Sequence, residues 1–137
     1  MDIERLKNNE EYVLLGMFGD ERQIALFYKE QPEFRITFWE AYFMDIFCEP
    51  VFPVFPETEW YGFTRDYQQA DRTLDFRDDS KAISDLDEYL NDLYTYKERM
   101  EHYKDERARA VYHLLCDFLA YAKETGMTVM VEEDLYH

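Results

Sequence analysis

The spacing of apolar residues changes along this chain, and the change limits the folds that it can adopt. In the first half, apolar residues come in short runs, and Phe34, Ile36 and Phe38 alternate with polar neighbours. In the second half, apolar residues recur every three or four positions, as between Val111 and Ala122. Alternation is typical of a half-buried strand, and three-to-four spacing is typical of an amphipathic helix. The pattern therefore predicts an α+β fold, with a sheet mostly from the first half and helices from the second.

Several segments of the first half have the composition of strands: 12–18, 23–28, 34–39, 60–67 and 73–76. Residues 19–22 separate the first two segments and have turn chemistry, so a hairpin is expected there. Segment 127–131, after the helices, is expected to add a last strand. The prediction is an antiparallel sheet of four to six strands, within a single domain that spans residues 1–137.

Three prolines at a spacing of three interrupt the first half of the chain. Pro50, Pro53 and Pro56 have no N–H group to donate to a neighbouring strand, so a central strand is excluded. The spacing fits a turn of polyproline II helix, with Phe52 and Phe55 on one edge. These apolar residues favour a strap that packs onto the protein. The alternative is a proline-rich ligand for another protein, which usually has a flanking Arg or Lys that this segment lacks.

The second half predicts two helices that pack on one face of the sheet. Candidate N-caps precede the first apolar stripe at residues 78–80 and 84–87, and the second stripe ends at Gly126, a typical C-cap. Both stripes keep one heptad phase, so residues 82–125 fit either one helix or two. A single helix would be ~65 Å long, which is too long for a small domain to cover. Two helices are therefore predicted, with a break at residues 102–105.

The chain carries 31 acidic and 15 basic side chains, which give a formal net charge of −16. Nucleic acid and anionic lipid need basic surface, so this surplus opposes direct binding to either and favours a basic protein partner. The sequence has no basic start followed by an apolar run, and no apolar stretch long enough to span a membrane. A cytoplasmic protein is therefore expected, with Cys48 and Cys116 as reduced, buried thiols.

The acidic surplus is uneven over the two predicted helices. Residues 82–105 hold seven acidic and three basic side chains, whereas residues 106–126 hold three of each. We expect the neutral second helix to pack against the sheet, and the acidic, tyrosine-rich first helix to contact a basic protein. The predicted partner contacts, which include the acids near the C-terminus, are Asp85, Glu88, Tyr89, Asp92, Tyr96, Glu132, Glu133 and Asp134. The alternative is an ordinary solvated helix with tyrosines at the edge of the core.

Motifs for catalysis or metal binding are weak. His113 and Cys116 share one helix face, but zinc needs about four ligands and the chain has no second pair at metal spacing. Glu98 and His102 are four residues apart and, with Glu101, could bind a metal ion. The same spacing fits a charge pair on the surface of a helix, which is the favoured interpretation. No phosphate-binding glycine loop, calcium loop or nucleophile with a partner base is recognisable. We therefore expect a protein that is not an enzyme and that uses no metal or cofactor.

These features together favour a small acidic inhibitor, such as an immunity protein, an antitoxin or an anti-defence protein. It would block a basic protein, with a nuclease as the expected target, because carboxylates can fill a cationic cleft and imitate phosphates. One alternative is a non-catalytic structural or adaptor module with an apolar interface. Another is an enzyme or metal-binding protein that uses clustered carboxylates. No motif indicates the oligomeric state.

Overall fold

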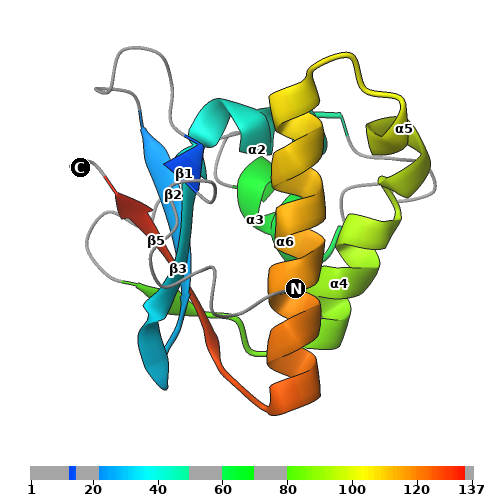
Figure 1. Cartoon of the computed structure of the whole chain (residues 1–137). Coiled ribbons are helices and arrows are strands. Elements are labelled where there is room, and N and C mark those ends of the chain that lie inside the picture. Colours follow the sequence, from blue (N-terminus) through cyan, green and yellow to red (C-terminus); the bar gives the residue numbers. More distant parts are fainter. Residues whose placement is uncertain (1–12, 15–21, 50–59, 70–79, 135–137) are drawn as a thin grey trace.

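The computed structural model describes residues 13–14, 22–49, 60–69 and 80–134. The fold is α+β, as the apolar spacing predicts, with a sheet on one side of the molecule and helices on the other (Figure 1). The proline strap at 50–56 and the strand expected at 73–76 lie outside the described residues. Within the described ranges, no helix has both the length and the apolar character that crossing a membrane requires.

Five strands form the sheet, in the order β1-β3-β2-β5-β4. Their bounds are Val13–Leu14 (β1), Gln23–Tyr28 (β2), Gln31–Trp39 (β3), Lys81–Ala82 (β4) and Val129–Asp134 (β5). β2 is the central strand and pairs antiparallel with both β3 and β5, and β4 pairs antiparallel with β5. The last strand predicted near the C-terminus is therefore confirmed, and it lies between strands from the first half and the short β4.

The hairpin predicted between the first two strands is wrong. β2 forms its hairpin with β3 instead, across a turn at Lys29 and Glu30. The described part of the earlier segment, β1, runs parallel to β3 on the other side of that strand. A two-residue connection brings β2 and β3 together at a low cost in loop entropy, so β3 takes the position beside β2.

One face of the sheet packs against α6 (Glu106–Thr125). Ile24, Leu26 and Tyr28 share this face of β2 and are at most 1% exposed. The Tyr28 ring stacks on Phe118 of α6, with ring centroids 4.1 Å apart, and the Tyr28 hydroxyl donates to the Phe118 carbonyl over 2.8 Å. The prediction that the neutral second helix packs against the sheet is thus confirmed.

The C-terminal helical region consists of α4 (Leu86–Tyr94), the short α5 (Lys97–Glu101) and α6, three helices where two were predicted, because residues 95–96 also interrupt the first predicted helix. The break between α5 and α6 falls at residues 102–105, the predicted interval. Asp105 starts α6, because its carboxylate accepts the N–H groups of Arg107 at 2.9 Å and Ala108 at 3.3 Å. Gly126 ends the helix with a φ of 75°, in the left-handed conformation that favours glycine.

Two further helices, α2 (Glu40–Phe47) and α3 (Gly62–Gln69), lie in the first half. The strand predicted at 60–67 is therefore wrong. Its buried aromatic residues, Phe63 and Tyr67, are four positions apart and share one face of α3. α2 begins directly after β3 and was not predicted. α2 packs against α6, and α3 packs against α4, so the helices form a continuous group beside the sheet (Figure 1).

Candidate functional site

The predicted contact face of α4 lies largely inside the protein. Tyr89 is 3% exposed, and Asp92 and Tyr96 are fully buried. The reason is that α4 packs against α3 on one side and against α6 on another. The prediction that these three side chains contact a partner is corrected accordingly. Asp85 stays exposed and caps α4 by accepting the N–H of the half-buried Glu88 over 3.2 Å.

The buried carboxylate of Asp92 joins α4 to the start of α3. It accepts the backbone N–H of Thr64 over 2.8 Å and the Thr64 hydroxyl over 2.7 Å. Because that hydroxyl has one proton and gives it to Asp92, the Tyr96 hydroxyl donates to the Thr64 oxygen, 2.5 Å away. Gly62 packs directly on this cluster, since a Cβ there would lie 2.8 Å from the Asp92 Cβ.

The electrostatic state of Asp92 is unusual for an aspartate. Burial raises the pKa of Asp92 to about 7, although the hydrogen bonds from Thr64 lower it. The neighbouring carboxylates of Asp66 and Glu88 add to the rise, because like charges disfavour ionisation. Such a pKa suits proton transfer in an active site. The side chain has no exposed surface, however, and its hydrogen bonds join α4 to α3.

A second polar cluster surrounds Tyr89 at the same contact between helices. The Tyr89 hydroxyl donates to Asp66 over 2.5 Å. Arg65 lies 3.2 Å from the Asp66 carboxylate and 3.4 Å from that of Glu88. Burial, together with the hydrogen bond to Asp66, raises the pKa of Tyr89. The charge of Glu88 is therefore partly compensated by a neighbouring guanidinium.

The acids predicted near the C-terminus lie on β5, where two of them form ion pairs across the sheet. Glu132 pairs with Arg35 and accepts the Ser80 hydroxyl over 2.8 Å. Desolvation raises the pKa of Glu132, but these hydrogen bonds outweigh it and the pKa lies below its ordinary value. Glu133 pairs with Arg22 over 2.9 Å. Asp134 is at the end of β5, opposite the first residue of β2.

Carboxylates that form no ion pair with another described residue lie near the meeting of α2 and α5, around two hollows that share Arg99. We define this corner surface by Met44, Asp45, Glu49, Glu98, Arg99 and Tyr103. Met44 is 43% exposed, which is unusual for a large apolar side chain here. Glu49 and Glu98 are exposed and form no ion pair with the part of the chain that the structure describes. A hollow of about 200 Å³ lies between α2 and α5 at this corner.

The guanidinium of Arg99, the arginine of the corner surface, forms hydrogen bonds with backbone carbonyls. Arg99 donates to the carbonyls of Glu49 at 2.7 Å and Asp45 at 3.3 Å, and also to that of Ile46. Its charge therefore compensates the C-terminal end of α2, where carbonyls lack helical partners. Tyr103 donates to the Asp45 carboxylate over 3.0 Å. Burial raises the pKa of Asp45, although the hydrogen bond from Tyr103 lowers it.

Thiol and metal chemistry has little support in the described residues. No group of three or more His, Cys, Asp or Glu side chains among them is placed to hold a metal ion. Cys48 and Cys116 are free thiols and are half-buried, which is less buried than predicted. Burial raises the pKa of Cys116 to about 11, so this thiol is protonated and a poor nucleophile near neutral pH.

Known proteins give no further guide. No family model, no curated protein and no solved structure matches this chain. Function must therefore be inferred from the surfaces themselves.

Sequence reasoning missed the α2 half of the corner surface because it did not predict α2. The signal was present: Tyr42, Phe43, Ile46 and Phe47 are buried, and their spacing is that of one helix face. With α2 assigned, Met44 would stand out as an apolar residue on the opposite, solvent side. The meeting of α2 with α5 joins residues fifty or more positions apart, and no local pattern indicates it.

Proposed function

We propose that the protein is a small inhibitor that binds a basic protein through the corner surface and blocks it, with a nuclease as the first class of target. Immunity proteins, antitoxins and anti-defence proteins act in this way. The observation that carries the proposal is a hollow lined by the exposed Met44, Asp45 and Glu49, beside a second hollow that is lined by Glu98 and shares Arg99 with the first. The guanidinium of Arg99 faces backbone carbonyls.

The physical case rests on two complementary contributions. The net charge of −16 attracts a cationic protein over long range and speeds association at low ionic strength. At contact, the flexible Met44 side chain adapts to an apolar neighbour, and the half-buried Tyr103 ring adds contact area beside it. Nucleases hold phosphates with Lys and Arg, and the corner carboxylates can pair with the same cations. The proposal therefore needs no catalytic group and no cofactor, and it assumes a cytoplasmic protein.

Affinity capture with charge-reversed variants tests this proposal. The tagged protein should retain a basic protein from a lysate of its native host at about 0.1 M salt and release it at high salt. The variant E49K/E98K should lose the partner. The control E33K/D117K changes the net charge equally at exposed positions outside the corner surface, and it should keep the partner. The purified partner should then lose its activity, nucleic-acid cleavage in the first instance, when the wild-type protein is added.

Two outcomes would overturn the proposal. One is that no basic protein is retained by the wild type. The other is that E49K/E98K and E33K/D117K retain it equally, because the corner surface would then make no specific contact. A metal-binding or enzymatic role would instead gain support from a rise in melting temperature on addition of Mg²⁺, Ca²⁺, Mn²⁺ or Zn²⁺.

A further inference from the structure

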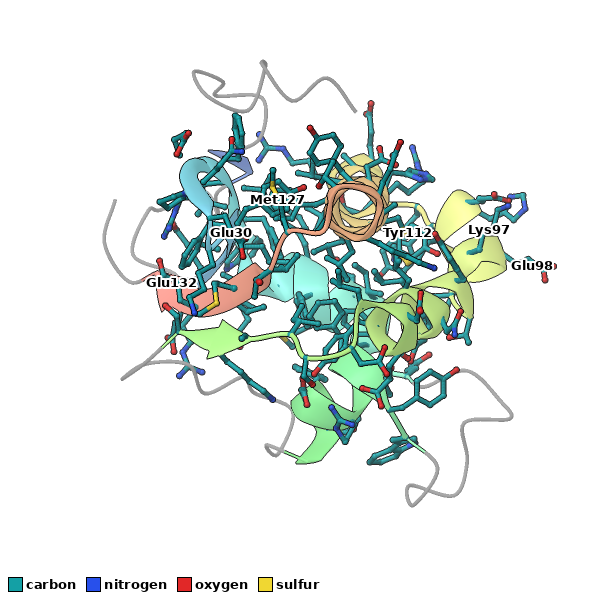
Figure 2. All side chains as sticks on the ribbon, turned by 90° about the horizontal axis from the view of Figure 1, so that it is seen from below. Glu30, Lys97, Glu98, Tyr112, Met127 and Glu132 are labelled. Carbon is teal, nitrogen blue, oxygen red and sulfur yellow. The ribbon has the colours of Figure 1, made fainter. Side chains whose placement is uncertain are left out.

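Tyr94, in the last turn of α4, is 49% exposed, more than any other large apolar side chain described. Two hollows flank its ring along the groove between α4 and α6. The first measures about 350 Å³ and lies toward the start of α4. The second measures about 430 Å³ and lies toward α5. Figure 2 shows Tyr112, which lines the second hollow, between α6 and α4.

The floor of this groove is apolar. Leu90 and Ala120 line the first hollow, and Tyr112 and Cys116 line the second. The only polar atom of the Tyr112 ring is engaged below the surface, because its hydroxyl donates to the Leu93 carbonyl over 2.6 Å. An exposed tyrosine between two hollows that each have apolar residues in their lining is typical of a protein contact, since the ring adds contact area at a low cost in conformational entropy.

The two hollows differ in charge. Asp87, Lys123 and Glu124 line the first, and the Lys123 ammonium lies 2.5 Å from the Asp87 carboxylate. Among the described residues that line this hollow, this pair leaves the charge of Glu124 without a cation. Lys97 and His113 line the second hollow, and no described residue in its lining is acidic. The groove is therefore negative at one end and positive at the other, with Tyr94 between them.

A surface with this polarity is complementary to itself. A two-fold axis through Tyr94, at right angles to α4, places the negative hollow of one copy opposite the positive hollow of the other. α4 and α6 lie side by side and run in opposite directions (Figure 1), so two such pairs can pack as four helices. A wholly basic partner fits less well, because its charge would meet Lys97.

We propose that a second copy of this chain binds the groove between α4 and α6, around a two-fold axis at Tyr94. In the dimer, the two Tyr94 rings meet near the axis, and Lys97 of each copy faces Glu124 of the other. None of the six residues that define the corner surface lines either hollow, although Glu98 directly follows Lys97 in α5. The dimer is therefore independent of the proposed function, and either can fail without the other.

The molar mass of the full chain in solution tests this inference. It is measured by sedimentation over a range of protein concentrations. The wild type should dimerise. K97E should raise the dissociation constant at least about tenfold, because it places a carboxylate opposite Glu124. The double variant K97E/E124K exchanges the charges within each copy and should restore the dimer. K104E makes the same charge change at an exposed residue that lines neither hollow, and it should behave as the wild type.

Three results would overturn the inference. The first is a wild-type chain that stays monomeric at the highest concentration. The second is equal weakening by K97E and K104E, which would show that only the net charge matters. The third is a double variant that stays as weak as K97E. Circular dichroism of each variant separates these results from a loss of folding.

Discussion

The Asp92 carboxylate of α4 accepts the backbone N–H of Thr64 in the first turn of α3, from a residue 28 positions away in sequence. Asp92 thus acts as an N-cap for α3, a role that in most helices belongs to the residue directly before the first turn. The start of α3 is thereby tied to α4 by a buried hydrogen bond to an acid, and the stability of this contact should depend on the protonation of Asp92.

The first prediction concerns pH. Burial raises the pKa of Asp92 to about 7, well above that of an aspartate in the unfolded chain. Between about pH 4 and pH 7, the folded state therefore binds more protons at this site than the unfolded state does. The free energy of unfolding should fall as the pH rises through this window, by an amount on the order of a few kcal/mol. Urea unfolding at a series of pH values measures it.

The variant D92N separates this effect from the general repulsion of a net charge of −16, which acts in the same direction. Its free energy of unfolding should change much less between pH 5 and pH 8 than that of the wild type. D117N removes an exposed carboxylate instead and should keep the wild-type slope. Equal slopes for D92N and the wild type would show that Asp92 does not titrate in this window.

The second prediction compares two glycines with positive φ. Gly62 has a φ of 61°, and an added Cβ would lie 2.8 Å from the Asp92 Cβ. Gly126 has a φ of 75° but open space around it. G126A should lower the free energy of unfolding by about 1 kcal/mol, because alanine is strained in the left-handed backbone conformation. G62A should cost at least about 1 kcal/mol more, because it also pushes Asp92 away from Thr64. Equal losses in urea unfolding would contradict the close packing at Gly62.

The strands and helices could be predicted from sequence where one local period dominates. β3 and α6 bury mainly one face each, so alternation or three-to-four spacing identifies them, whereas β2 is buried on both faces and stands out as a short apolar run. α4 is harder, because α3 covers a second face of it and buries Tyr89, Asp92 and Tyr96. In the sequence, these residues have the spacing of the polar, aromatic edge of an amphipathic helix, which predicts that they are exposed. Only the tertiary contact with α3, a helix that the sequence reading took for a strand, places them inside.

The candidate contact surfaces were harder to predict for a related reason. Charge in the sequence does not show which acids pair with a cation: Glu132 pairs with Arg35 on β3, and Glu133 pairs with Arg22 just before β2. The helix with balanced charge, α6, contributes Glu124 to the negative end of the groove because its Lys123 pairs with Asp87 of α4. Ion pairs between different helices and strands therefore decide which charged side chains are left without a partner. The amino-acid composition of one segment does not show this.

The third prediction concerns the end of α2. Arg99 donates to several carbonyls there, and R99M keeps much of the aliphatic stem while removing every donor. The free energy of unfolding should fall by about 2 kcal/mol, because the carbonyls and the helix end lose a charged partner. K104M removes an exposed charge nearby and should change stability by less than about 0.5 kcal/mol. Similar losses for both variants would assign the effect to charge alone.

The last prediction uses salt to separate the two proposed contacts. Binding of a basic partner by the corner surface should weaken at least about tenfold between about 0.05 M and about 0.5 M salt, because opposite charges attract over long range and salt screens them. Self-association joins two chains that each carry −16, so salt screens a repulsion as well as the local pairs, and the dimer should be as strong or stronger at high salt. Calorimetry on the partner complex and sedimentation of the free chain measure the two constants. If both constants weakened in parallel with salt, the apolar contact around Tyr94 would not be the main source of dimer stability.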